Sequence, residues 1–262
     1  MKPPKKGNVA FANGYNRVKL TRHGYMMYNA NDRFVGRSLD AYGECCEEEV
    51  RFLLSLVGPD SVVLDVGANY GALTLPLARA ARLVYAFEPQ REVFCALAGN
   101  MALNCVANVV CENMALSDRA GTIKVPQLDF GAENNIGGLE LDYRGESTQR
   151  TYAVRSETLD EYVARSQLPR IDLVKVDVEG MEAQVLRGAR ATLARFRPIL
   201  YVENDREDKA PVLLALLAEL GYAWEAHAPP LFNPRNFFGN PANVWGMNYV
   251  STNLVCRPAP PA

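Results

Sequence analysis

The chain has 262 residues, of which 48% are hydrophobic and 22% are charged, close to the averages of globular proteins; this length allows one large domain or two small ones. Its formal net charge of −2 and pI near 5.8 give no general attraction to nucleic acid or anionic membranes. No apolar run reaches the roughly 18 residues of a transmembrane helix, and the basic start is not followed by the apolar segment of a secretory signal. We therefore expect a cytoplasmic protein with no membrane insertion and no nucleic-acid partner.

The first 60 residues are expected to form a helical or irregular extension to the main domain, which covers residues 61–262. A short basic, proline-rich tail begins the extension and is interpreted as a solvated end. An amphipathic helix is expected from about Gly43 to Val57, because its apolar residues recur on one face. The turn at Gly58-Pro59-Asp60 ends this helix.

From residue 61 onward, short apolar runs alternate with helical patterns. Strands are expected at 62–66, 83–87, 108–111, 171–176, 199–202, 222–226 and 251–256, with strands or a hairpin at 121–125 and 151–155. Helices are expected at 72–81, 90–104, 181–196 and 211–220, and surface loops at 127–150 and 229–247. This alternation predicts a doubly wound α/β domain, in which helices cover both faces of a mostly parallel sheet.

Polar residues stand where several of the expected strands end. Open α/β sheets bind ligands outside the carboxyl ends of their strands, near the point where the strand order reverses. The residues at these ends are Asp65 with the Gly67–Gly71 turn, then Glu88, then Asp177 with Glu179, and finally Glu203 with Asn204. These strand ends are therefore the predicted ligand site.

The Gly67–Gly71 turn and Glu88 together indicate a nucleoside-containing cofactor. Glycines in the turn let a ligand approach the backbone closely, and the helix that follows offers free N–H groups. Glu88 lies at the end of the adjacent strand, where its carboxylate can accept hydrogen bonds from both hydroxyls of a ribose. The dinucleotide fingerprint has a second glycine where this chain has Asn69, whose side chain would crowd a pyrophosphate. This disfavours NAD, whereas S-adenosylmethionine has no phosphate.

Four motifs resemble the FkbM-type methyltransferases. They are Leu64–Gly71, Ala86–Pro89, Ala115–Asp118 and Val174–Gly180, the last followed by Glu182, Val185, Leu186, Gly188 and Ala189. The resemblance covers roughly residues 60–203. It implies the class I methyltransferase fold, a Rossmann-like, mostly parallel seven-stranded sheet, with S-adenosylmethionine as cofactor and O-methylation of hydroxyls on sugars or secondary metabolites. Tyr70 departs from the family pattern, which expects a smaller or aliphatic residue at the pocket rim.

The candidate cofactor-binding residues follow from the strand ends and from this resemblance. They are Glu44, Asp65, Gly67, Ala68, Asn69, Gly71, Glu88, Pro89, Asn113, Ser117 and Asp177. Some of them have a structural alternative. Asp65 either binds or only orders the turn, Asn113 faces the adenine or starts a loop, and Ser117 binds or forms a turn with Asp118. Glu44 either lies over the methionine end of the cofactor or belongs to a plain helix start. The segment Asn135–Gly138 is either a flexible lid beside the acceptor or a loop.

The candidate catalytic residues are Asp177, Glu179 and His227. The two acids stand where acceptor and methyl group should meet, although acids are also favoured in the first turn of a helix for electrostatic reasons. His227 is either a general base or a solvated side chain. Glu182 is interpreted as a structural first-turn acid.

A metal-dependent route is also conceivable from the sequence. Asp177, Glu203 and Asn204 offer three oxygen ligands of the kind that magnesium prefers, as in catechol methyltransferases. We favour a metal-free route, because the FkbM resemblance carries no metal requirement. With two histidines and no Cys-x-x-Cys spacing, a zinc site is not expected.

The leading hypothesis is an O-methyltransferase of a glycan or another small hydroxylated molecule. The alternatives are N-methylation of a small molecule or peptide, a non-catalytic cofactor-binding module, and a nicotinamide oxidoreductase on a similar sheet. The six cysteines are expected to be free thiols. The sequence does not indicate the oligomeric state or the acceptor.

Overall fold

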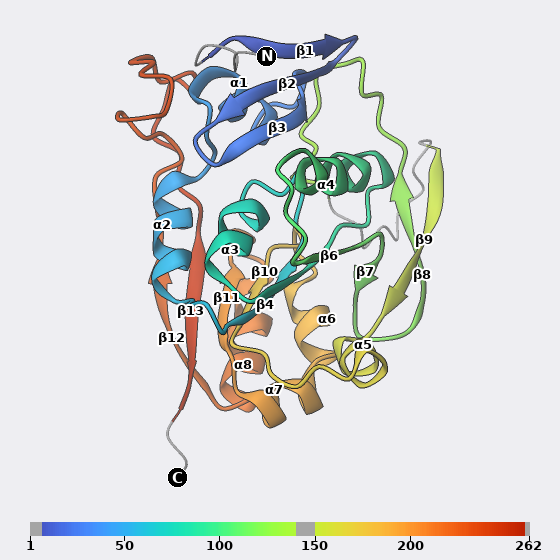
Figure 1. Ribbon diagram of the computed structural model, residues 1–262. Helices are drawn as coiled ribbons and strands as arrows, with labels where there is room; N and C mark the ends of the chain where they lie inside the picture. Colours follow the sequence, from blue (N-terminus) through green and yellow to red (C-terminus); the bar gives the residue numbers. More distant parts are fainter. Residues whose placement is uncertain (1–6, 140–149, 260–262) are drawn as a thin grey trace.

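A seven-stranded sheet forms the centre of the computed structural model, which describes residues 7–139 and 150–259 (Figure 1). Its strand order is β12-β13-β11-β10-β4-β5-β6. The strands are β4 (Val62–Val66), β5 (Leu83–Phe87), β6 (Val109–Glu112), β10 (Leu173–Val176), β11 (Ile199–Glu203), β12 (Tyr222–His227) and β13 (Asn253–Pro258). The five strands from β11 to β6 pair in parallel, and β13 is antiparallel to both of its neighbours. The predicted doubly wound, mostly parallel sheet is confirmed.

Helices cover both faces of this sheet, because the central strands are apolar on both sides. On β4, Leu64 packs into the core that contains α5, α6, α7 and α8, whereas Val63 faces the core that contains α2 and α3. These helices are α2 (Glu47–Ser55), α3 (Thr74–Ala80), α5 (Leu159–Ser166), α6 (Glu182–Arg187), α7 (Arg190–Phe196) and α8 (Ala210–Glu219). Every residue of β4 is buried. The carboxyl ends of the strands are left for polar side chains.

The N-terminal segment contains an antiparallel sheet that the sequence analysis did not predict. Its strands are β1 (Val9–Asn13), β2 (Asn16–Thr21) and β3 (Gly24–Asn29), and α1 (Val35–Tyr42) follows. The backbone N–H and C=O groups on the outer edge of β3 have no partner strand among the described residues. They are bonded instead by side chains of α4 (Arg91–Leu103) and of the residue that follows it. The side-chain amide of Asn100 bonds Met27 N and O at 2.6 and 3.0 Å, and that of Asn104 bonds Tyr25 N and O at 2.9 and 2.7 Å. Two asparagines one helical turn apart thus replace a partner strand.

The helix expected over 181–196 is in fact two helices, α6 and α7, which are separated at Gly188. A Cβ atom on Gly188 would lie 2.1 Å from the carbonyl oxygen of Ser117, so the chain must approach that backbone closely. Asp160 then accepts hydrogen bonds from Thr192 N at 2.7 Å and Ala191 N at 3.0 Å, which satisfies the first turn of α7. The break is therefore a consequence of tertiary packing.

A second small sheet lies beside the main one in the order β7-β9-β8. It consists of β7 (Ala115–Leu116), β8 (Gly121–Pro126) and β9 (Thr151–Glu157). Of the two alternatives for the last two segments, separate strands or a hairpin, the structure shows an antiparallel pair. The loop expected over 127–150 includes residues 140–149, which lie outside the described residues, as does most of the basic tail. Within residues 7–139 and 150–259, none of the helices has the length and apolar character needed to cross a membrane.

Candidate functional site

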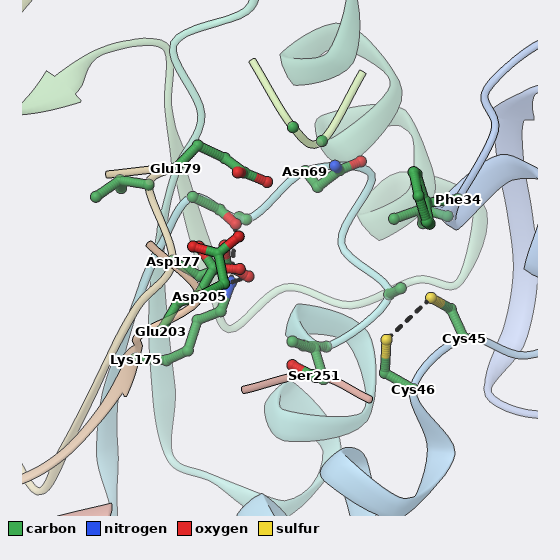
Figure 2. A pocket seen from close by; sticks show the side chains of 18 of the residues that line it. Phe34, Cys45, Cys46, Asn69, Lys175, Asp177, Glu179, Glu203, Asp205 and Ser251 are labelled. Carbon is green, nitrogen blue, oxygen red and sulfur yellow. Dashed lines mark hydrogen bonds and ion pairs between the residues drawn. The ribbon is translucent and has the colours of Figure 1, made fainter. Parts of the chain in front are cut away.

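A cavity of about 400 Å³ opens at the carboxyl ends of β4, β5, β10 and β11 (Figure 2). The strand ends contribute Gly67, Ala68, Asn69, Glu88, Pro89, Gln90, Lys175, Asp177, Val178, Glu179, Glu203, Asp205 and Arg206. The N-terminal segment contributes Phe34, Val35, Cys45, Cys46 and Glu49, and the turn just before α3 contributes Ala72 and Leu73. The connection from β8 to β9 contributes Asn135, Gly137, Gly138 and Leu139, and that from β12 to β13 contributes Leu231, Val250, Ser251 and Thr252. The cavity therefore joins three separate parts of the chain at the predicted sheet edge.

The turn after β4 forms the floor of this cavity. Gly67 has φ +84°, and a Cβ atom there would lie 1.8 Å from the carbonyl oxygen of Asp177, so only glycine fits. Ala68 and Asn69 line the cavity as predicted, and Asn69 is left-handed with φ 51°. Gly71 does not line it, because it packs against Leu97 in the core.

Glu88 lies on the cavity wall at the end of β5. One carboxylate oxygen accepts a hydrogen bond from Asn69 N at 2.9 Å and the other accepts one from Gln90 N at 2.8 Å. Each oxygen keeps a second lone pair for a ligand hydroxyl. Burial of this carboxyl raises its pKa to about 7. A buried carboxylate with two remaining acceptor positions fits the two hydroxyls of a ribose.

Asn113 supports this wall from behind. Its side-chain amide donates to the carbonyl oxygens of Glu88 at 2.9 Å and Pro89 at 3.1 Å, and Asn113 does not line the cavity. Ser117 is also buried away from the cavity, with its carbonyl against Gly188. Tyr70, expected at the pocket rim, is instead buried in the core that contains Leu97.

Asp65 is completely buried beneath the floor. It accepts a hydrogen bond from Thr74 Oγ1 at 2.6 Å and lies 3.4 Å from Lys175 Nζ. It therefore orders the turn and does not line the cavity. Of the two interpretations of Asp65, the structural one matches this geometry.

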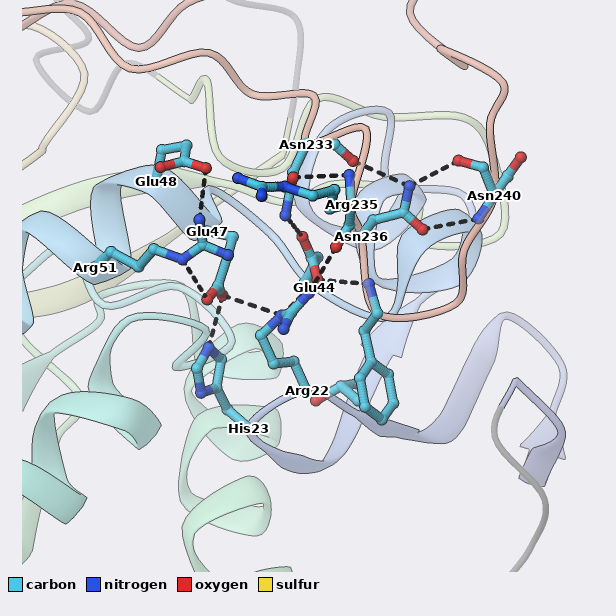
Figure 3. Close-up of polar contacts among 12 residues, drawn as sticks. Arg22, His23, Glu44, Glu47, Glu48, Arg51, Asn233, Arg235, Asn236 and Asn240 are labelled. Atoms are coloured by element: carbon cyan, nitrogen blue, oxygen red, sulfur yellow. Dashed lines mark hydrogen bonds and ion pairs between the residues drawn. The ribbon is translucent and has the colours of Figure 1, made fainter.

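Glu44 lies behind the cavity wall in a polar network (Figure 3). It accepts from Arg22 Nε at 2.6 Å, Asn233 Nδ2 at 2.7 Å and Phe237 N at 2.7 Å. This network ties the turn between α1 and α2 to the C-terminal loop. The residues of that turn which reach the cavity are Cys45 and Cys46, followed by Glu49 in α2.

His227 and Asn204 are not brought to the cavity. The His227 ring bonds the hydroxyl of Tyr201 through Nδ1 at 2.9 Å and lies against Phe52 with ring centroids 4.1 Å apart. Burial lowers the pKa of His227. Asn204 lines a separate hollow beside Lys209. His227 is therefore not retained as a candidate base, and Asn204 is not retained as a ligand in this site.

The loop Asn135–Gly138 lines the cavity opposite α2, beside Asn69. It is anchored rather than free. Gln90 Nε2 donates to Ile136 O at 2.8 Å, and the neighbouring Asn134 exchanges backbone hydrogen bonds with Asn31 and Arg33 at 3.0 and 2.8 Å. The N-terminal segment thus holds this loop beside Asn69 in the cavity wall.

Three carboxyl groups meet on the side of the cavity away from Glu88. Asp177, Glu179 and Glu203 can each offer one oxygen so that these atoms lie within 4.8 Å of one another. Glu182 does not join them, because its carboxylate accepts from Gly180 N at 2.9 Å and Val178 N at 3.2 Å, as a structural first-turn acid does. Of the three residues considered for the alternative metal-dependent route, the structure brings Asp177 and Glu203 together, with Glu179 in place of Asn204.

Two cations balance part of this negative charge. Lys175 is buried, donates to Gly67 O at 2.9 Å and lies 3.1 Å from Asp177 Oδ2. Burial alone would lower the pKa of Lys175, but the carboxylates of Asp177 and Asp65 outweigh burial and raise it. Arg206 donates to Glu179 Oε2 at 2.7 Å.

Burial and mutual repulsion separate the proton affinities of these acids. Burial, followed by the charge of Asp177, raises the pKa of Glu203 to about 12 and that of Glu179 to about 8. Glu203 therefore carries a proton at neutral pH, whereas Glu179 exchanges its proton near the physiological range. Acids with such different pKa values can take different roles in one site.

Comparison with known proteins gives a family match over residues 65–223, to the model described as the methyltransferase FkbM domain. The hexuronic acid methyltransferase AglP of Haloferax volcanii is 30% identical over 162 residues, 59% of each chain. The 31-O-demethyl-FK506 methyltransferase FkbM of Streptomyces tacrolimicus is 30% identical over 201 residues, 66% of this chain and 77% of that protein. The 2-O-methyltransferase NoeI of Sinorhizobium fredii is 30% identical over 57% of this chain and 65% of its own length.

Among solved structures, a precorrin-6y C5,15-methyltransferase from Geobacter metallireducens has a TM-score of 0.50 at 12% identity, over 81% of this chain and 88% of that chain. It shares the fold. The matches to AglP and NoeI span less than two thirds of those proteins. The cavity residues between Phe34 and Glu49 and between Leu231 and Thr252 lie outside the matched domain.

Replacing Lys175 by Met should destabilise the fold strongly, because it leaves the carboxylate of Asp65 buried without its cation. Removal of one partner from a buried ion pair costs about 3–5 kcal/mol. Urea unfolding measures this change, with Lys124→Met, at an exposed position in β8, as the matched control. The double variant Lys175→Met/Asp65→Asn should recover part of the loss. Equal stability of Lys175→Met and Lys124→Met would contradict the role assigned to this ion pair.

Proposed function

Because the chain belongs to the FkbM methyltransferase family, we propose that it is an active S-adenosylmethionine-dependent O-methyltransferase that acts on a hydroxyl of a sugar or of a natural product. The observation that carries the proposal is the cavity itself. Glu88, whose carboxylate keeps acceptor positions of the kind that a ribose needs, lies on one side, and the acid cluster of Asp177, Glu179 and Glu203 on the other lines the same space. The relatives named above, by their printed names, act on a hexuronic acid and on demethylated FK506.

The residues around the Gly67 turn would hold the cofactor. The cavity volume of about 400 Å³ lies within the usual range of small-molecule sites, about 300–1,000 Å³. Glu88 would accept the ribose hydroxyls, and the glycine turn would let the ligand lie against the backbone of Ala68 and Asn69. S-adenosylmethionine supplies the methyl group from a sulfonium centre when it is bound. The acids beside Lys175 complement that positive charge.

Glu179 is the best-supported general base. Its side chain lines the cavity, its pKa lies near the physiological range, and Arg206 fixes one of its oxygens. Glu203 already carries a proton, and Asp177 is held by Lys175 at 3.1 Å. The proton of the acceptor hydroxyl would pass to the Glu179 carboxylate as the oxygen becomes a nucleophile. Phe34, Leu231 and Val250 would exclude water from the reacting atoms.

The experiment that tests the proposal compares metabolite and glycan extracts from cells with and without the protein. One compound should be heavier by a single CH₂ unit when the protein is present, and purified protein with S-adenosylmethionine should convert the lighter compound. Methylation of a nitrogen would support the N-methyltransferase alternative. Cofactor binding without any product would support the non-catalytic module.

Replacing Glu88 by Ala should weaken the binding of S-adenosylhomocysteine by about 1.5–3 kcal/mol, the range for hydrogen bonds to a charged group. Calorimetric titration measures the affinity, and Glu92→Ala, an exposed acid on α4, serves as the control. Unchanged affinity in Glu88→Ala would remove the ribose assignment. Tight binding of NAD to the wild type would favour the oxidoreductase alternative.

Replacing Glu179 by Gln should lower kcat about 10²–10⁴-fold, the usual contribution of a general base, at unchanged affinity for S-adenosylhomocysteine. The base must be deprotonated, so the wild-type kcat/KM should rise with pH through about 8, and this rise should disappear in the variant. Glu207→Gln, an exposed acid, is the control. If EDTA abolishes methyl transfer and magnesium restores it, a metal on the three carboxylates replaces Glu179 as the activator.

A further inference from the structure

Two adjacent cysteines stand in the cavity wall opposite the acids. The sulfurs of Cys45 and Cys46 are 3.2 Å apart and face each other beside the floor of the cavity (Figure 2). All six cysteines of the chain are free, and among the described residues these two are the ones that line the cavity. Neither the cofactor site nor the proposed base uses them. Their position therefore calls for a separate explanation.

The local backbone holds both sulfurs on the same side. Cys46 is left-handed with φ 53°, and its carbonyl oxygen accepts from Val50 N at 2.9 Å at the start of α2. Glu44, the residue before the Cys45–Cys46 pair, is held by hydrogen bonds from Arg22 and Asn233 to its carboxylate. Left-handed conformation is unfavourable for residues other than glycine, and it persists where the surroundings impose it. The dipeptide is thus clamped between two anchored segments in a conformation that brings its thiols into contact.

From this geometry we propose that Cys45 and Cys46 form a reversible dithiol–disulfide site that is oxidised by small-molecule disulfides such as oxidised glutathione. The Cys45 thiolate attacks the small disulfide, which gives a mixed disulfide and releases one thiolate. The Cys46 thiolate then attacks the Cys45 sulfur and releases the second. Two protein thiols and one small disulfide become one protein disulfide and two small thiols, which keep the two protons.

The order of attack follows from the surroundings of the two sulfurs. The hydrogen bond to Cys45, burial and the nearby carboxylate of Glu49 all raise the pKa of Cys46, so Cys46 is the poorer initial nucleophile. It is in contact with Cys45 and can act second. Neighbouring Cα atoms lie about 3.8 Å apart across a trans peptide, below the usual range of about 4.4–6.8 Å for a disulfide. The ring is therefore strained, and strained disulfides are readily reduced.

Ring closure would change the cavity. A disulfide bond of about 2.05 Å draws Cys45 toward Cys46 and reorients the peptide at the start of α2. That helix carries Glu49, which lines the same cavity. We expect oxidation to weaken S-adenosylhomocysteine binding several-fold, a consequence that rests on the proposed function, whereas the disulfide itself does not.

Peptide mapping tests the disulfide directly in the full-length protein. Both cysteines fall in the tryptic peptide 38–51, which contains no other cysteine. After incubation with oxidised glutathione, this peptide should lack both alkylation sites and lose two hydrogens, and dithiothreitol should reverse the change. Cys46→Ser should trap a glutathionyl group on Cys45, and Cys45→Ser should remain unmodified at Cys46. Cys105→Ser, at an exposed cysteine, should oxidise like the wild type.

Two results would overturn the proposal: a peptide 38–51 that is still alkylated at both cysteines after oxidation, or one that carries glutathione without closing the ring. Calorimetry of oxidised and reduced wild type with S-adenosylhomocysteine tests the consequence separately. Reduced protein that does not bind this ligand refutes the proposed function and leaves the mapping result intact. Equal affinity of both forms refutes the coupling between the disulfide and the cavity.

Discussion

The close approach of β4 and β10 at their carboxyl ends is the constraint on which the site depends. Gly67 lies so near the carbonyl of Asp177 that no side chain fits between them. Lys175 joins the same two strands, because its ammonium group bonds Gly67 O and lies between Asp65 and Asp177. A buried cation fixed by three oxygens sets the turn that forms the cavity floor and the orientation of the first acid of the cluster. Both ligand-facing walls are built from this point.

The walls that the strands do not supply come from the two ends of the chain. Glu44 links the turn after α1 to Asn233 in the C-terminal loop. Glu47, three residues later, forms an ion pair with Arg22 and a hydrogen bond with His23 (Figure 3). These buried carboxylates are paired with cations or amides, which is what makes their burial tolerable. Two segments outside the family match are thereby held against each other, and both contribute residues to the cavity wall.

The sequence predicted the main sheet well because its strands are short apolar runs bounded by turns. Such runs are too short for a helix and too apolar for an exposed loop, so a buried strand is the structure they favour. The prediction from sequence failed where contacts between distant residues determine the local structure. The sheet of β1–β3 alternates weakly and is completed by Asn100 in α4 and Asn104 just after it, both distant in sequence. The break at Gly188 depends on the Ser117 backbone. Helix α5 had a readable signal that we did not use, the Thr158/Glu161 capping box.

The sequence predicted those cavity residues that lie at the ends of the central strands. It was wrong for a residue that also ends a strand but whose strand lies elsewhere in the sheet. Gly67, Ala68, Asn69, Glu88, Pro89, Asp177 and Glu179 line the cavity, and their roles remain predictions. His227 also ends a strand, but β12 is an edge strand far from the point where the strand order reverses. Cys45, Glu49 and Ser251 belong to segments with no motif, so no local pattern could have indicated them.

Glu49, Glu88 and Glu179 share one electrostatic property, which is a pKa raised by burial in the cavity wall. Burial raises the pKa of Glu49 and Glu88 to about 7, as it raises that of Glu179 to about 8. Their unfolded-state pKa is near 4.3, so the stability that their protonated forms contribute is complete below that pH and is lost as the pH rises through the folded values. A positively charged occupant favours the ionised carboxylates and lowers these pKa values. Binding of a cation such as a sulfonium is then coupled to proton release, and the cation adds to the charge balance that Lys175 and Arg206 already provide.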